Sequence, residues 1–284
     1  MWLRRRWRRD DAAIARWSGL EAAVVVTGGS EGIGRAIARR FAKRGRTVVL
    51  VARRADKLTT AAAAITSEFG VKAFPLALDL MAPDAPQTLE AELSTRGLYA
   101  DILVNNAGLG LGGEFVEQRS EEIGALIDLN VRSLSLLTRH FLPAMCVRGE
   151  GGVLNVASLG GYAPGPYQAA YYASKAYVIS LTEAVAWESR GLGARIAVLA
   201  PGPVQTEFHK RMGADDALYR WLIPAPSPEL TAISAVSGFM WGRTVITPGP
   251  LAFVAAWAMR LTPHPILIPI VAWLLKPRGS DRNV

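Results

Sequence analysis

Short runs of β-branched residues alternate with longer stretches of helical periodicity from residue 22 onward. This alternation is typical of repeated β-α-β units, in which helices cover both faces of a parallel sheet. Strand patterns lie at residues 22–27, 47–52, 73–78, 102–105, 152–157, 195–200 and 244–246, and helical patterns at residues 33–44, 55–69, 120–145 and 166–190. The sequence therefore predicts an α/β fold with a doubly wound, parallel, seven-stranded sheet in three layers.

A glycine-rich turn lies directly between the first predicted strand and the first predicted helix. Glycine adopts backbone angles that are closed to other residues, and without a Cβ it lets backbone amides approach a pyrophosphate at the positive end of a helix. The position of the turn in a β-α-β series favours a dinucleotide site over a purely structural turn. The candidate cofactor-binding residues of this turn are Thr27, Gly28, Ser30, Gly32, Ile33 and Gly34.

The T-G-x-x-x-G-x-G spacing of this turn differs from the common G-x-G-x-x-G and resembles that of the short-chain dehydrogenases/reductases. The resemblance covers residues 21–209 and includes further marks in the family's order. These are Asp79-Leu80, Asn105-Asn106-Ala107-Gly108, Asn130, Ser158, Tyr171-x-x-x-Lys175 and Pro201-Gly202. The resemblance implies a Rossmann-like fold and an NAD(P)-dependent oxidoreductase acting on CH–OH groups, near a bacterial branch related to hydroxysteroid dehydrogenases and ketosphinganine-type reductases.

The resemblance also implies roles along the dinucleotide. Asp79 and Leu80 are expected beside the adenine, and Val204 with Thr206 at the carboxamide of the nicotinamide. The other residues implied to bind the cofactor are Asn106, Ala107, Gly108, Pro201, Gly202, Tyr171 and Lys175.

The choice of cofactor depends on the end of the second strand. A carboxylate there accepts hydrogen bonds from the ribose of NAD and repels the 2′-phosphate of NADP. This sequence has Ala52 at that position, followed by Arg53 and Arg54, whose planar cations suit a phosphate. We therefore expect a preference for NADP(H), with NAD(H) left open because Glu31 occupies a place where several NADP-using relatives have a basic residue.

The candidate catalytic residues are Ser158, Tyr171, Lys175 and, by resemblance, Asn130. Tyr171 and Lys175 are four residues apart on a predicted helix, so their side chains share a face. A cation beside a phenol favours its ionised form, and we expect Lys175 to lower the pKa of Tyr171 so that it serves as an acid and base. The resemblance implies that Ser158 binds the substrate oxygen and that Asn130 holds a water of the proton relay; Tyr172 is expected to be a packing neighbour.

Composition limits the other classes of function. The net charge of +8 includes five arginines within residues 4–9, so the basic character is partly local and no nucleic-acid partner is expected. Cys146 is the only cysteine, which excludes an internal disulfide, and arginines interrupt every apolar stretch before residue 17, unlike a signal peptide. We expect a cytoplasmic protein.

His140, His209 and His264 lack metal-ligand spacing, and His209 is expected to be packed or solvated unless it touches substrate from a flap.

The chain is predicted to contain one domain, since its length and 50% apolar content suit a single α/β core. Residues 21–250 form the predicted Rossmann domain, residues 1–20 a basic amphipathic extension and residues 251–284 an apolar extension. The proline-rich residues 203–226 follow a strand's carboxyl end, where ligands bind in such sheets, and predict a mobile substrate flap; the alternative is a passive surface loop.

Both extensions carry an interfacial pattern. Leu3, Trp7, Ile14 and Trp17 fall on one face of a helical projection, while residues 251–275 are largely apolar but interrupted by Arg260, His264 and three prolines. That apolar segment is too broken to span a bilayer. One interpretation is peripheral contact with the inner membrane surface; the other is that the apolar tail packs over the substrate cleft or a subunit interface.

The sequence therefore supports three hypotheses about the function of the chain. The first is NADPH-dependent reduction of an apolar ketone, and the second is reduction of a lipid-type keto substrate at a membrane surface. The third is a dinucleotide-binding regulator without turnover, although such proteins usually lose the tyrosine or the lysine. The resemblance further suggests a homodimer or homotetramer built on the helices of residues 120–145 and 166–190.

Overall fold

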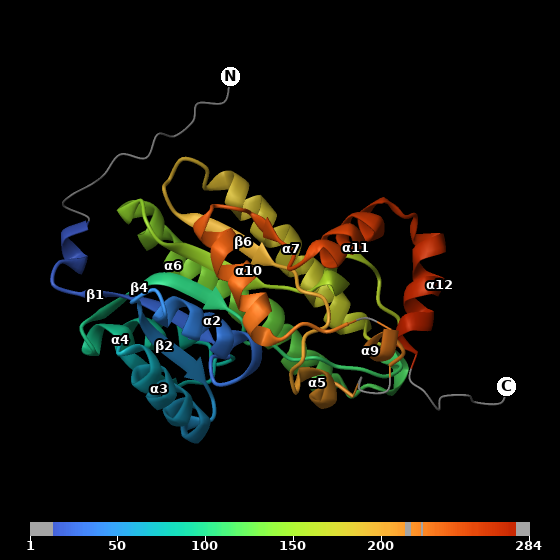
Figure 1. The fold of residues 1–284 in the computed structure, drawn as a ribbon, viewed down its shortest axis with the longest axis horizontal. Coiled ribbons are helices and arrows are strands. Elements are labelled where there is room, and N and C mark those ends of the chain that lie inside the picture. Colours follow the sequence, from blue (N-terminus) through green and yellow to red (C-terminus); the bar gives the residue numbers. More distant parts are fainter. Residues whose placement is uncertain (1–13, 214–216, 223, 277–284) are drawn as a thin grey trace.

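The computed structural model describes residues 14–213, 217–222 and 224–276. One parallel sheet crosses the molecule with strand order β3-β2-β1-β4-β5-β6-β7 (Figure 1). Its strands are β1 (Glu21–Thr27), β2 (Thr47–Ala52), β3 (Ala73–Ala77), β4 (Leu98–Asn105), β5 (Gly152–Val156), β6 (Arg195–Leu199) and β7 (Val245–Ile246). The predicted Rossmann-like, seven-stranded fold is confirmed, with β4 beginning four residues before its predicted start.

Helices cover both faces of the sheet. α2 (Gly32–Ala42), α3 (Ala55–Phe69) and α10 (Pro228–Met240) lie on one face, and α4 (Ala85–Thr95), α6 (Leu134–Arg148) and α7 (Ala169–Glu188) on the other. α5 (Ser120–Ile127) joins α6 through the π-helical segment Asp128–Ser133. The periodicity did not predict α4 or α10, because neither helix has a clear apolar stripe. In α10 several positions are alanine or serine.

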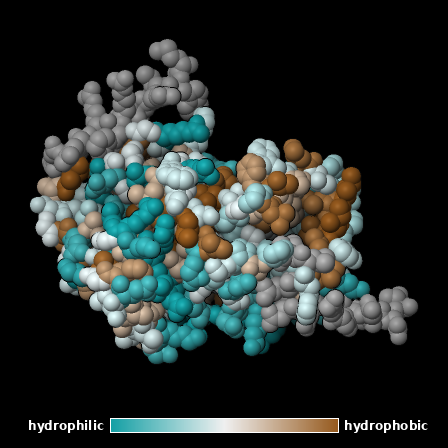
Figure 2. Space-filling model, in the orientation of Figure 1, coloured by the Kyte–Doolittle hydropathy of each residue, from teal (hydrophilic) through white to brown (hydrophobic). Residues whose placement is uncertain are grey.

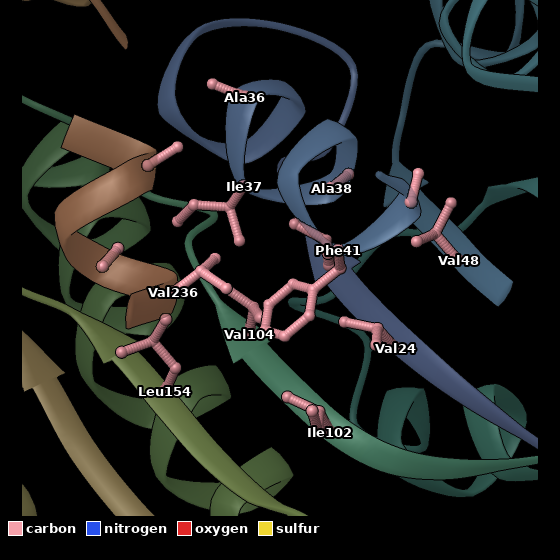
Figure 3. Close-up of a cluster of buried hydrophobic side chains, with 14 of the residues drawn as sticks. Val24, Ala36, Ile37, Ala38, Phe41, Val48, Ile102, Val104, Leu154 and Val236 are labelled. Carbon is pink, nitrogen blue, oxygen red and sulfur yellow. The ribbon is translucent and has the colours of Figure 1, made fainter. Parts of the chain in front are cut away.

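The core beneath α2 fixes the glycine turn in place. The Phe41 ring of α2 is fully buried against Val24 of β1, Ile102 of β4 and Val236 of α10 (Figure 3). Burial of an aromatic ring of this size contributes about 1.5 to 3 kcal/mol. This cluster ties the helix that follows the glycine turn to the centre of the sheet and to α10.

The flap at residues 203–226 contains regular structure, although the sequence predicted a proline-rich loop there. It carries two short helices, α8 (Phe208–Arg211) and α9 (Tyr219–Leu222), over the carboxyl edge of the sheet. The prolines that argued against helices flank these turns instead of interrupting them.

Two further helices, α11 (Pro250–Leu261) and α12 (His264–Leu275), extend from the sheet at one end of the molecule (Figure 1). One face of α12 packs on the fold through Leu267, Val271 and Leu275, which contact a cluster containing Ala163 and Tyr219. No helix in the described ranges is long and apolar enough to cross a bilayer.

Only part of the predicted amphipathic N-terminal helix can be placed. Leu3 and Trp7 lie outside the described residues, and Ile14 precedes the short helix η1 (Ala15–Trp17). The guanidinium of Arg148 lies 4.7 Å from the centroid of the Trp17 ring. Trp17 is therefore partly buried against Arg148.

Candidate active site

A cavity of about 1240 Å³ lies at the carboxyl edge of the sheet and extends from the glycine turn to α12. It brings together most of the residues that the sequence singled out, although they come from seven separate segments of the chain. Those lining it are Gly28, Ser30, Gly32, Ile33, Arg53, Arg54, Asp79, Leu80, Asn106, Ala107, Gly108, Ser158, Tyr171, Lys175, Pro201, Gly202, Val204 and Thr206.

The glycine turn has the shape that a pyrophosphate requires. Gly28 and Gly32 adopt φ angles of +63° and +55°, which are open to glycine and strained for other residues. α2 begins at Gly32, and Glu31 before it makes no side-chain capping hydrogen bond, so the first amides of the helix remain available to an anion. The turn therefore fits the phosphates of a dinucleotide.

Two of the predicted cofactor-binding residues, Thr27 and Gly34, do not line the cavity but support the residues that do. The Thr27 hydroxyl donates to the Val104 carbonyl and accepts from the amides of Asn106 and Ala107 at 2.9 and 3.0 Å. A Cβ on Gly34 would lie 2.4 Å from the Gly28 carbonyl oxygen. Thr27 and Gly34 therefore hold the turn against the loop after β4 and are not among the residues that line the cavity.

Cations surround the far end of the cavity, where β2 ends. Arg53 and Arg54 are exposed there beside Ala52, and Arg35 of α2, which the sequence analysis did not single out, also lines the cavity. Glu31 faces them, and its Oε2 accepts a hydrogen bond of 2.9 Å from Arg54. The arrangement offers more positive than negative charge to an anionic group at this position.

Ser158, Tyr171 and Lys175 meet on the wall formed by β5 and α7. Ser158 follows β5, and its Oγ accepts a hydrogen bond of 3.1 Å from the Gly160 amide. Tyr171 and Lys175 lie one turn apart on α7 and are both buried. Burial raises the pKa of Tyr171 above its usual value, and a hydrogen bond with Ser158 opposes this only in part.

The expected effect of Lys175 on Tyr171 is not found. The Lys175 Nζ donates to the Val156 carbonyl at 3.0 Å and lies 5.7 Å from the centroid of the Tyr171 ring. Burial also lowers the pKa of Lys175 to about 8. The sequence showed the shared helix face but not the burial of both groups, and burial penalises phenolate and ammonium alike.

Asn130 supports the site from the π-helical segment. Its amide exchanges two hydrogen bonds of 2.8 Å with the backbone of Leu109 and donates a third, of 3.1 Å, to Ser174. π-Helical segments often occur at functional sites because they re-aim one side chain. In this structure Asn130 fixes the loop after Gly108, a role that the sequence resemblance did not indicate.

Gln168, His209 and Tyr172 also line the cavity, and of these only Gln168 had no signal in the sequence. Gln168 is buried and precedes α7, directly after Tyr167, which has a positive φ of 63°. His209 shares a hydrogen bond of 2.8 Å with the Tyr219 hydroxyl, so it is a packed flap residue. The Tyr172 ring packs directly against Gly165, where a Cβ would lie only 2.3 Å from the ring. This position is consistent with a packing role for Tyr172.

The fold and this site define a dinucleotide-dependent oxidoreductase. The family model for short chain dehydrogenases matches residues 22–217. The chain therefore belongs to the short-chain dehydrogenase/reductase family, whose members are NAD(P)-dependent oxidoreductases acting on CH–OH groups.

Individual relatives agree with this assignment. A short chain dehydrogenase of Pseudocercospora fijiensis is 40% identical over 197 residues, which cover 68% of this chain and 62% of the relative. A very-long-chain 3-oxoacyl-CoA reductase of Bos taurus is 33% identical over 232 residues, covering 80% and 70%. A short-chain dehydrogenase from Sphingobium yanoikuyae, solved in complex with NADPH, has a TM-score of 0.75 and 34% identity, covering 83% of this chain and 91% of that one.

Proposed function

We propose that this chain reduces an apolar ketone to a secondary alcohol with NADPH. The observation that carries the proposal is the position of Ser158 and Tyr171 where the cofactor end of the cavity meets its apolar end. When bound, the nicotinamide supplies the hydride for the carbonyl carbon. Tyr171 keeps its proton at neutral pH because burial raises its pKa, so it can donate that proton to the carbonyl oxygen.

Ser158 and Lys175 have supporting roles in this proposal. Ser158 shares a hydrogen bond with Tyr171, and its single hydroxyl proton can be donated to the carbonyl oxygen instead when the substrate is bound. Lys175, with a pKa of about 8, holds a proton close to Tyr171 that can replace the one transferred. Asn130 keeps the neighbouring loop in place through Leu109.

The preference for NADP(H) is part of the same proposal. Arg53 and Arg54 follow the end of β2, Arg35 also lines the cavity, and Ala52 presents no carboxylate to repel a phosphate. The Sphingobium relative, which binds NADPH, supports the choice. NAD(H) use remains compatible with the fold, because Glu31 engages one of the arginines.

The apolar class of substrate is inferred from the other half of the cavity. Beyond Tyr171 the wall is built by α7, the flap, α11 and α12, and its side chains are mostly apolar or aromatic. They include Tyr172, Phe208, Met212, Tyr219, Met259, Val271, Leu274 and Leu275. The name of the bovine relative, an oxoacyl reductase, is consistent with a substrate that carries a long apolar chain.

NADPH oxidation with methyl ketones of graded chain length tests this function. Each methylene that enters the apolar half contributes about 0.8 kcal/mol, so kcat/KM should rise by up to about fourfold per added carbon until the chain reaches the mouth. NADPH oxidation without ketone is the background. A kcat/KM that stays flat or falls from 2-butanone to 2-decanone would contradict an apolar substrate.

A second candidate, reduction of a lipid-type keto substrate at a membrane surface, is favoured by the outer face of α11 and α12. Phe253, Leu261, Ile266 and Trp273 are all exposed there, Leu261 by 75%. Figure 2 shows apolar side chains gathered over these two helices. The inner face of α12 covers the cavity while its outer face is exposed among the described residues, so the tail can both belong to the fold and contact lipid.

Cosedimentation with liposomes tests this second candidate. The full chain should pellet with anionic vesicles at low salt, and Trp257→Ser combined with Trp273→Ser should reduce binding by about tenfold, because each removes a side chain suited to the headgroup region. Trp187→Ser is the control, since Trp187 is equally exposed but lies on α7. If the intact protein stays in the supernatant with anionic and neutral vesicles, the membrane candidate fails.

We also propose a homodimer or homotetramer built on α5–α6 and α7. Exposed apolar side chains on these helices, including Ile127, Leu136 and Tyr177, support an interface there.

A further inference from the structure

A salt bridge joins the flap to the glycine turn across the mouth of the cofactor cavity. The Glu31 carboxylate, directly before α2, accepts a hydrogen bond from the guanidinium of Arg211, the last residue of α8. The two residues are 180 positions apart in the chain, and both line the cavity. The other oxygen of Glu31 contacts Arg54 at 2.9 Å and Lys57 at 3.5 Å.

The flap segment that carries Arg211 rests on both sides of the cavity. At one side, a Cβ on Gly32 of the glycine turn would lie 3.3 Å from the Thr206 methyl group. At the other, a Cβ on Gly110 would lie 2.7 Å from the Met212 Cβ and 2.9 Å from the Phe208 ring. Residues 206–212 therefore cross from the turn after β1 to the loop after β4, above the space between them.

The charges at this crossing are complementary. Burial tends to raise the pKa of Glu31, but hydrogen bonds and charge from Arg211 and Arg54 outweigh it and hold the pKa below its usual value. Glu31 is thus ionised at neutral pH. A carboxylate beside the phosphates of a dinucleotide would repel them, and the guanidinium of Arg211 offsets that charge while it tethers the flap.

We propose that Glu31 and Arg211 form a clasp that holds the flap over a bound dinucleotide and slows its release. The inference rests on the cofactor site of the proposed function, and the two are positioning residues rather than catalytic ones. The clasp acts where both cofactors have the same chemistry, at the turn that receives the pyrophosphate. It therefore retains NADPH and NADH alike, in contrast to the arginines at the end of β2.

Arg211→Gln tests the clasp through the rate of cofactor release, followed by stopped-flow displacement of NADPH and of NADH. An exposed ion pair contributes up to about 1 kcal/mol, so release of both cofactors should accelerate by about twofold to fivefold. Lys210→Gln, which removes the same charge from the exposed neighbour on α8, is the control and should leave both rates unchanged. Arg53→Ala should affect only NADPH, by about tenfold or more, because only NADPH presents a phosphate to that guanidinium.

A double-mutant cycle then tests whether Glu31 and Arg211 act together. In a Glu31→Ala background, Arg211→Gln should no longer accelerate release, because the partner is already missing. Equal acceleration in both backgrounds, an equal effect of Lys210→Gln, or an effect on NADPH alone would overturn the clasp. A wild-type chain that binds neither cofactor would instead overturn the proposed function.

Discussion

Replacing Tyr171 with phenylalanine should lower kcat for ketone reduction by roughly 10² to 10⁴ while changing the affinity for NADPH by less than about twofold. The hydroxyl is the group expected to give its proton to the substrate oxygen, and burial keeps that proton in place at neutral pH. The phenylalanine ring preserves the packing against Phe208, whose centroid lies 5.6 Å away. The measurement is steady-state kinetics together with a fluorescence titration of NADPH.

Tyr172→Phe is the matched control for this variant. Tyr172 is the adjacent phenol, and burial raises its pKa as well. Its ring fills the space beside Gly160 and Gly165, so the substitution keeps the packing and removes only the hydroxyl. Its kcat should stay within about threefold of wild type, well short of a general-acid contribution. Equal losses in the two variants would indicate that Tyr171 is not the proton donor.

Local patterns are sufficient to predict the sheet and to bring most of the candidate site residues to one edge of it. The order of strands and helices follows from periodicity, and parallel strands place their carboxyl ends at one edge. For that reason Gly28, Ser158 and Tyr171, which are far apart in the sequence, could be assigned to one cavity before the fold was described. The short-chain dehydrogenase motifs supplied the roles that periodicity alone does not carry.

Properties that depend on burial or on distant contacts could not be predicted in this way. The spacing of Tyr171 and Lys175 shows a shared face, yet the pKa of each is shifted by its desolvation rather than by its neighbour. The bond between Glu31 and Arg211 joins segments with no common motif. Likewise, α10 has weak periodicity and is a helix because its small residues pack closely on α2.

Lys175→Met should abolish most of the activity and change how stability depends on pH. In the folded, cofactor-free chain burial lowers the pKa of Lys175 from 10.5 to about 8, so between these values the unfolded chain binds more protons. The free energy of unfolding must then rise with pH across this window. Below pH 8 both states are protonated, and the folded state carries the cost of the buried charge.

Denaturant unfolding of the cofactor-free proteins from pH 7 to pH 10.5 measures this effect. The stability of the wild type relative to Lys175→Met should increase over that range by up to about 3 kcal/mol, which is the free energy that corresponds to the lowered pKa. At pH 7 methionine removes the buried charge but leaves the Val156 carbonyl without its lysine partner, and the lost hydrogen bond offsets part of the gain. Lys210→Met, an exposed substitution, should run parallel to wild type. If the curve of Lys175→Met is instead parallel to wild type, burial does not lower the pKa of Lys175 in the folded chain.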